Sequence, residues 1–321
     1  MHDETKTVMT SIAQTDAPGV HPHHRHGWWW KTLIAGLILW AVTVVVTGVT
    51  LNSNLIPTLI LIGSFLVPFC VVLFVVERVA GNVSVLQVIL AFFVGGMSGV
   101  LGASLLEANL NANFWTYIMV GFIEEFVKAA ILVIVGWRVL GKTARQGALL
   151  GATIGAGFAA FESAGYAFNA AITAQGIDLT SLLQTEMLRA ILAPVGHVLW
   201  TAIIGAALFG VARGRDRFRW SFLILATYVG VAILHALWDS MGGISSFLAL
   251  VFTGNALEQL QYGFLMPRTA HAASNLATTL YIVGLALATV LGILALWIAL
   301  GRPTRRSIAA RRAAALAGPP E

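Results

Sequence analysis

The stretch FWTYIMVGFIEEFVKAAILVIVGW, residues 114–137, decides the interpretation of this chain. It is long and apolar enough to cross a lipid bilayer, yet Glu124, Glu125 and Lys128 lie at its middle. One acid or lysine at the centre of a membrane helix costs about 2.5–3.5 kcal/mol on scales derived from membrane insertion. Three such groups in one helix predict compensating partners on neighbouring helices, and so a polar site inside the membrane.

The composition of the whole chain indicates a protein that crosses a membrane several times. Hydrophobic residues make up 58% of the 321 residues and charged residues only 10%, whereas soluble proteins carry about 25% charged residues. Windows of about 20 apolar residues predict an all-α, polytopic bundle of about eight transmembrane helices. We expect these helices at residues 32–51, 55–76, 84–106, 114–137, 147–169, 188–212, 220–243 and 275–300. The single cysteine, Cys70, excludes an intramolecular disulfide and a cysteine-ligated metal cluster.

The distribution of basic residues predicts how this bundle is oriented. Most of the 19 lysines and arginines fall into segments that share one side of the membrane if both termini are cytoplasmic. Because basic loops tend to stay in the cytoplasm, we expect this orientation. The net charge of +5 is therefore a topology signal that favours contact with anionic lipid, and it does not predict nucleic-acid binding.

Three segments are expected along the chain. Residues 1–27 form a mobile, His-containing cytoplasmic leader, residues 28–300 the transmembrane domain, and residues 301–321 a basic cytoplasmic tail. The first apolar run follows the leader and lacks a small-residue cleavage site, so we expect an uncleaved anchor. The leader sequence HPHHRH at 21–26 admits loose metal binding, but no second ligand cluster accompanies it, and we favour a solvated segment.

Four further ionisable residues fall inside the predicted spans, namely Glu162, His197, His235 and Asp239. Counted from the outer ends of their helices, Glu124, Glu162, His197 and His235 all lie at depths of about 10–15 Å. Four helices thus bring ionisable groups to one level in the outer half of the membrane. A single intramembrane histidine or ion pair is often structural, but this convergence predicts a functional polar cavity.

The spacing of these residues within their helices predicts how they pair. Lys128 follows Glu124 by four residues and Glu125 by three, so its side chain can lie between them on one face. Adjacent glutamates diverge by about 100° around the helix axis, so one can face the cavity while the other pairs with Lys128. Asp239 follows His235 by four residues and can orient the imidazole.

Three classes of function are compatible with such a cavity. A hydrolase would use a glutamate to activate water, and Glu162, His197 and His235 offer a set of donors for Zn²⁺ with an open position. A proton-coupled transporter would use similar Glu, His and Asp chains, but such proteins usually contain internal repeats, and none is evident here. A structural or metal-binding scaffold leaves the glutamate pair with Lys128 unexplained.

Four short motifs in order carry a family resemblance. EEFVK at 124–128 matches an EExxK motif, FAAFE at 158–162 contains an FxxxE motif, and His197 precedes Trp-Thr at 200–201, with HALWD following at 235–239. This core, about 114–243, resembles the PrsW family of bacterial intramembrane proteases, which is distantly similar to the CAAX prenyl-endopeptidase superfamily. The resemblance implies a multi-pass peptidase of the bacterial inner membrane. Its expected substrate is a membrane protein, in characterised members an anti-sigma factor, cut on the extracytoplasmic side.

Carried over residue by residue, the resemblance implies roles for the motif residues. Glu124 becomes the base that activates water, and Glu125 with Lys128 supports it. The remaining residues line the site: Glu162, His197, His235 and Asp239.

The chain also departs from the CAAX-type pattern at two positions. Those relatives usually have histidine where this chain has Glu162, and often asparagine near Asp239. Two mechanisms therefore stay open, one with Zn²⁺ held by Glu162, His197 and His235, and one with glutamate alone. We favour the metal-independent glutamate and keep zinc as the alternative. The substrate identity and the oligomeric state are not predicted.

Overall fold

The computed structural model describes residues 27–301, except 80–82, 112, 114, 175, 256–258, 260, 262 and 264–266. The expected leader at 1–27 and tail at 301–321 therefore lie almost wholly outside the described residues. The described chain is nearly all helical, with one small hairpin. Its elements are α2 (Trp28–Thr50), η1 (Ser53–Leu55), α3 (Ile56–Val76), α4 (Val85–Leu90), η2 (Ala91–Gly95), α5 (Gly96–Glu107), α6 (Thr116–Gly136), α7 (Ala144–Ala171), β1 (Ile172–Thr173), β2 (Gly176–Ile177), α8 (Leu179–Leu192), η3 (Ala193–Val195), α9 (His197–Ala212), α10 (Phe222–Phe252) and α12 (Pro267–Leu300).

Seven helical segments of the described part are long and apolar enough to cross a membrane. Helix α6 has 21 residues, a length of about 31 Å, and differs from those seven by carrying Glu124, Glu125 and Lys128 at its centre. The predicted all-α polytopic bundle is confirmed. The orientation with both termini in the cytoplasm stays a prediction.

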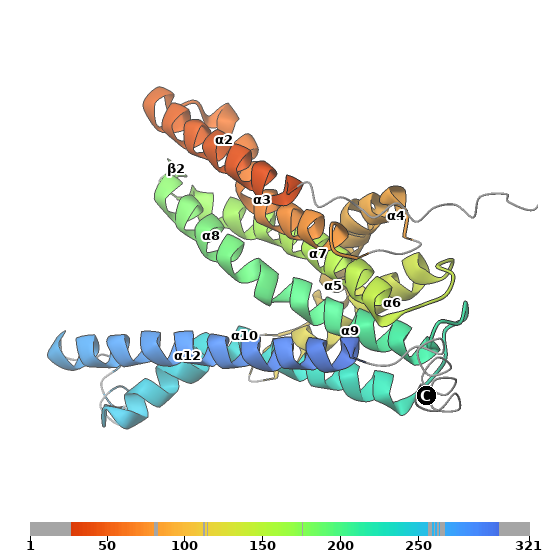
Figure 1. Ribbon diagram of the computed structural model, residues 1–321. Coiled ribbons are helices and arrows are strands. Elements are labelled where there is room, and N and C mark those ends of the chain that lie inside the picture. Colours follow the sequence, from red (N-terminus) through yellow and green to blue (C-terminus); the bar gives the residue numbers. More distant parts are fainter. Residues whose placement is uncertain are drawn as a thin grey trace, which may run out of the picture.

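Helices α7 and α9 form the centre of the bundle, with α2 and α3 at one edge and α10 and α12 at the other (Figure 1). Glycines allow the two central backbones to touch. A Cβ added at Gly151 would collide with the carbonyl oxygen of Thr201, and one at Gly155 with that of His197. Small residues at four-residue spacing permit such close approach in membrane bundles. This contact places the start of α9, and so His197, directly against α7.

The predicted span 188–212 was wrong in two respects. The helix begins earlier, at Leu179, where the Asp178 carboxylate accepts a hydrogen bond from the backbone N–H of Ser181. It is then interrupted at η3, which contains Pro194 and is followed by Gly196, before α9 starts. Proline cannot donate a backbone hydrogen bond, so the helix is broken there. As a result His197 lies at a helix start, where backbone N–H groups carry partial positive charge.

Candidate active site

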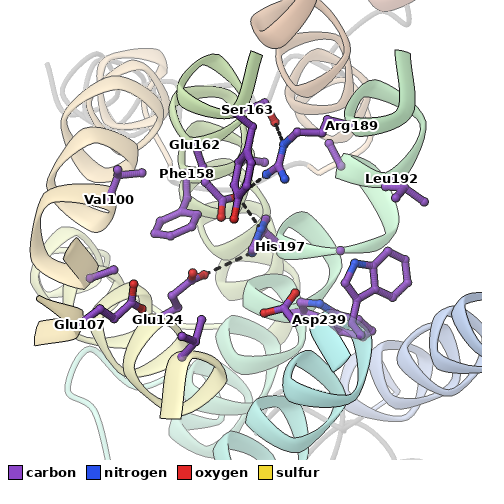
Figure 2. Close-up of a pocket in the computed structure, with 18 of the residues that line it drawn as sticks. Val100, Glu107, Glu124, Phe158, Glu162, Ser163, Arg189, Leu192, His197 and Asp239 are labelled. Carbon is purple, nitrogen blue, oxygen red and sulfur yellow. Dashed lines mark hydrogen bonds and ion pairs between the residues drawn. The ribbon is translucent and has the colours of Figure 1, made fainter. Parts of the chain in front are cut away.

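A cavity of about 540 Å³ opens where α5, α6, α7, α8, α9 and α10 meet. Its lining includes Glu124, Glu162, His197 and Asp239, which Figure 2 shows pointing towards one another from different helices. Wall residues that carry no charge include Val100, Phe158, Leu192 and Trp238. The cavity is therefore a polar centre with largely apolar walls, inside a membrane bundle.

On α6 the lysine lies between the two glutamates. Lys128 Nζ is 2.6 Å from Glu125 Oε1 and 3.3 Å from Glu124 Oε2, and Glu125 and Lys128 are completely buried. Glu124 is 5% exposed and reaches the cavity, whereas Glu125 points away from it. The helix turn thus separates a carboxylate that can meet a substrate from one that holds the lysine.

His235 on α10 is fixed by Glu125 from behind. Its Nδ1 lies 2.9 Å from Glu125 Oε1, and because a carboxylate accepts, Nδ1 carries the hydrogen. The free nitrogen, Nε2, lies 3.4 Å from Asp239 Oδ2 and 3.7 Å from Glu124 Oε2. The imidazole therefore presents Nε2 towards the cavity side of the cluster.

His197 has the same arrangement with the nitrogens exchanged. Its Nε2 lies 2.9 Å from Glu162 Oε2, and its Nδ1 lies 3.1 Å from Lys128 Nζ and 3.7 Å from Glu124 Oε2. Because the lysine donates, Nδ1 accepts and Nε2 carries the hydrogen. Both imidazoles thus bind a carboxylate with one nitrogen and turn the other towards Glu124. The structure brings all the predicted site residues into one connected network.

Arg189, which was not predicted as a site residue from the sequence, supports Glu162. The guanidinium forms an ion pair with Glu162, its Nε donates to Ser163 Oγ at 2.7 Å, and its plane lies 4.2 Å from the ring centroid of Tyr166. Arg189 is the second residue of the predicted span 188–212, at its outer end, and was not counted among the ionisable residues inside the membrane. The Asp178 cap at the true helix start is the signal that would have corrected this.

Three of these side chains could hold a metal ion. Ligand atoms of Glu124, His197 and His235 all lie within 4.8 Å of one another. Tetrahedral Zn²⁺ needs ligand atoms about 3.4 Å apart, close to the 3.7 Å from Glu124 Oε2 to each imidazole. Carboxylates on the second nitrogen of each histidine are also typical of metal sites. The donor set fits Zn²⁺, with Glu124 as the carboxylate, where the sequence had suggested Glu162.

One contact opposes a metal in this arrangement. The ammonium of Lys128 touches both Glu124 and His197, so it already supplies positive charge beside the ligand atoms. A divalent cation there would meet electrostatic repulsion from the lysine. The same geometry therefore also suits a metal-free site in which Lys128 is the cation.

The fold and the site define a class: a multi-pass membrane protein with a buried centre of carboxylates, a lysine and two histidines. A family model described as PrsW family intramembrane metalloprotease matches residues 28–257. The chain belongs to this family, and it is an intramembrane protease. Neither a curated protein nor a solved structure matches it significantly.

Proposed function

We propose that the protein hydrolyses a peptide bond of a membrane-anchored protein near the extracytoplasmic face of a bacterial plasma membrane, with Glu124 as the base. The single observation that carries this proposal is the position of the Glu124 carboxylate. It reaches the cavity between His197 Nδ1 and His235 Nε2, and each imidazole is held through its other nitrogen by a second carboxylate. Such a fixed constellation suits water activation.

The residues divide the work of hydrolysis between them. Glu124 takes a proton from a water molecule, and the resulting hydroxide attacks the carbonyl carbon of the scissile bond. Negative charge then develops on the carbonyl oxygen, and the ammonium of Lys128 supplies positive charge nearby. Glu124 returns the proton to the leaving amine as the C–N bond breaks, which restores the starting state.

The positions of the other network residues support this division. Glu125 and Glu162 each hold one imidazole, while Asp239 lies beside His235 Nε2 and lines the cavity. We assign these three residues to orientation of the histidines. We assign proton transfer to Glu124, since it is the carboxylate that approaches both His197 Nδ1 and His235 Nε2.

Whether the site uses Zn²⁺ can be tested directly. If bound, Zn²⁺ would polarise the carbonyl and lower the pKa of water. Its ligands in this geometry would be Glu124, His197 and His235. The sequence alone had predicted Glu162 in place of Glu124. We favour the metal-free site because Lys128 provides the cation. Metal analysis of purified protein, combined with chelator treatment, distinguishes the two: stoichiometric zinc with chelator-sensitive turnover would overturn our preference.

The decisive experiment compares membrane proteomes of cells that carry the wild-type protein or Glu124→Gln. We expect one membrane protein, by family resemblance a regulator of the anti-sigma factor type, to stay uncut in the variant. His235→Ala should act in the same way. Glu77→Gln is the matched control, because Glu77 accepts a hydrogen bond from the Trp28 N–H far from the cavity. Unchanged cleavage with Glu124→Gln would reject the proposal.

A second candidate, proton-coupled transport, is favoured by one feature. Ionisable groups form a continuous chain that runs from Asp239 through His235, Glu125, Lys128 and His197 to Glu162 and Arg189. Such chains also carry protons in membrane pumps. Transport predicts substrate-dependent proton flux in proteoliposomes that Glu124→Gln abolishes, with no cleaved product. A structural protein predicts that these substitutions reduce only stability.

A further inference from the structure

The cavity contains one carboxylate that the proposed chemistry does not use. Glu107 is the last residue of α5 and lines the cavity on the same wall as Glu124, with Arg189 on the opposite side (Figure 2). Its carboxyl forms no hydrogen bond or ion pair with any described residue, and Oε1 is shielded from solvent without a partner. An unpaired buried polar atom costs about 1–3 kcal/mol, and more for a charged group.

The other acids that line the cavity all have basic partners. Glu124 contacts Lys128, Glu162 contacts Arg189, and Asp239 contacts His235. Glu107 is the exception among the described lining residues. Its place at the end of α5 adds to the cost, because the carbonyl groups at a helix C-terminus carry partial negative charge and disfavour an acid there.

Among the described residues of the cavity lining, no basic side chain is free to neutralise Glu107. Arg189 is the lining arginine, and its guanidinium is already shared between Glu162, Ser163 and the ring of Tyr166. Lys128 is completely buried behind Glu124 and Glu125. A basic group carried by the molecule that enters the cavity would therefore meet an unpaired carboxyl at Glu107.

We propose that Glu107 is a specificity residue that selects substrates with a lysine or arginine close to the scissile bond. The inference rests on the proposed peptidase function and names its substrate class. An ammonium or guanidinium forms strong charge-assisted hydrogen bonds with a carboxylate. Because Glu107 shares a wall with Glu124, a basic side chain at Glu107 lies within a few residues of the bond that the Glu124-activated water attacks. Specificity arises because a substrate without this charge leaves the carboxylate unpaired.

The test uses purified full-length protein in nanodiscs and a mixture of peptides that varies the residues around the cleaved bond. Cleaved products are identified by mass spectrometry, and kcat/KM is then measured for one lysine peptide and its norleucine counterpart. We expect enrichment of lysine and arginine at one position. Glu107→Gln should reduce kcat/KM for the lysine peptide roughly ten- to a hundredfold, as for loss of one charged hydrogen bond. The kcat/KM for the norleucine peptide should stay unchanged. Glu107→Lys should shift the preference to acidic residues.

A matched control is Ser104→Ala, which changes another cavity-lining residue of α5 without altering charge. It should leave the preference intact. Equal loss on both peptides with Glu107→Gln, or no basic preference in the wild type, would overturn the inference while the peptidase function stands. Thermal melting of each variant identifies misfolded protein, and Glu107→Asp, which keeps the charge, should retain the preference.

A binding measurement keeps the inference testable if no peptide is cut. The Glu124→Gln variant is titrated with the same lysine and norleucine peptides, with and without Glu107→Gln. We expect the lysine peptide to bind at least fivefold more tightly, and this advantage to disappear with Glu107→Gln. Selective binding without cleavage by the wild type would contradict the peptidase function alone. Equal binding of the two peptides would contradict the role of Glu107.

Discussion

Two lysines in the described part of the chain are fully buried, and each is next to a phenylalanine ring. Lys128 lies in the membrane centre of α6, with Nζ 4.3 Å from the ring centroid of Phe158. Lys142 lies in the connection between α6 and α7, with Nζ 4.7 Å from the ring centroid of Phe218. The two lysines are alike in burial and in ring contact. They differ in the atoms that surround each ammonium.

Lys142 is surrounded by backbone. Its Nζ donates to the carbonyl oxygens of Val139 at 2.7 Å and Trp137 at 3.1 Å, and to that of Asp216. Burial lowers the pKa of Lys142, and the carboxylate of Asp216 opposes that shift. Carbonyl oxygens do not titrate, and these bonds join the α6–α7 connection to the α9–α10 connection.

Lys128 is surrounded by groups that exchange protons. Glu124, Glu125 and His197 all lie within 3.3 Å of its Nζ. Any proton that moves between them changes the charge that the lysine must balance. Burial of a lysine is therefore not itself a sign of function. The chemistry of its partners separates a structural cation from one that can take part in a reaction.

The largest expected effect is a loss of activity in the Lys128→Met variant. Loss of a cation beside developing negative charge should reduce kcat about 100- to 1000-fold. Lys142→Met should leave kcat per folded molecule within about twofold, since no partner of Lys142 lines the cavity. Both variants are measured on the substrate found in the proteome comparison. Equal loss of kcat in the two variants would show that burial alone explains them.

The next effect concerns stability and is specific to Lys128. Removing one partner of a buried ion pair costs about 3–5 kcal/mol, because the remaining charge is left uncompensated. Lys128→Met should therefore lower the unfolding free energy by about this amount, with His235 as the remaining partner of Glu125. The double variant Lys128→Met with Glu125→Gln should recover stability but not activity. Recovery of both would place Lys128 among the structural residues.

The site was largely predictable because its signal is local. Charged residues in an apolar span are conspicuous, and the i, i+3 and i, i+4 spacing of Glu124, Glu125 and Lys128 follows from helix geometry. The shared depth of residues on four helices was also accessible, since depth follows from counting residues. Their convergence on one cavity was inferred from the free-energy cost of placing charged groups inside the membrane. The structure brings them within hydrogen-bonding distance.

The residues that were missed lie where hydropathy windows fail. A window of about 20 residues averages over helix ends, so the polar start of α8 was cut off and Arg189 fell at the very end of the predicted span. Glu107 fell one residue beyond the predicted span 84–106, although it ends α5. The break before His197 was signalled by Pro194 and Gly196, but a hydrophobic average does not register it.

The smallest expected effect is a loss of stability in the Lys142→Met variant. Lys142→Met leaves three carbonyl oxygens without their donor, and hydrogen bonds to a charged group contribute about 1.5–3 kcal/mol. Because the connection can relax and admit water at the membrane surface, we expect a loss of about 2–3 kcal/mol, measured by thermal unfolding in nanodiscs. Asp216→Ala is the control: it removes the carboxylate that accepts from the exposed Gly141 N–H at 2.7 Å but keeps the carbonyl bound to the lysine. It should cost less than Lys142→Met, about 1 kcal/mol. A larger loss with Asp216→Ala would mean that a carboxylate, and not the backbone, neutralises Lys142, and the contrast with Lys128 would then disappear.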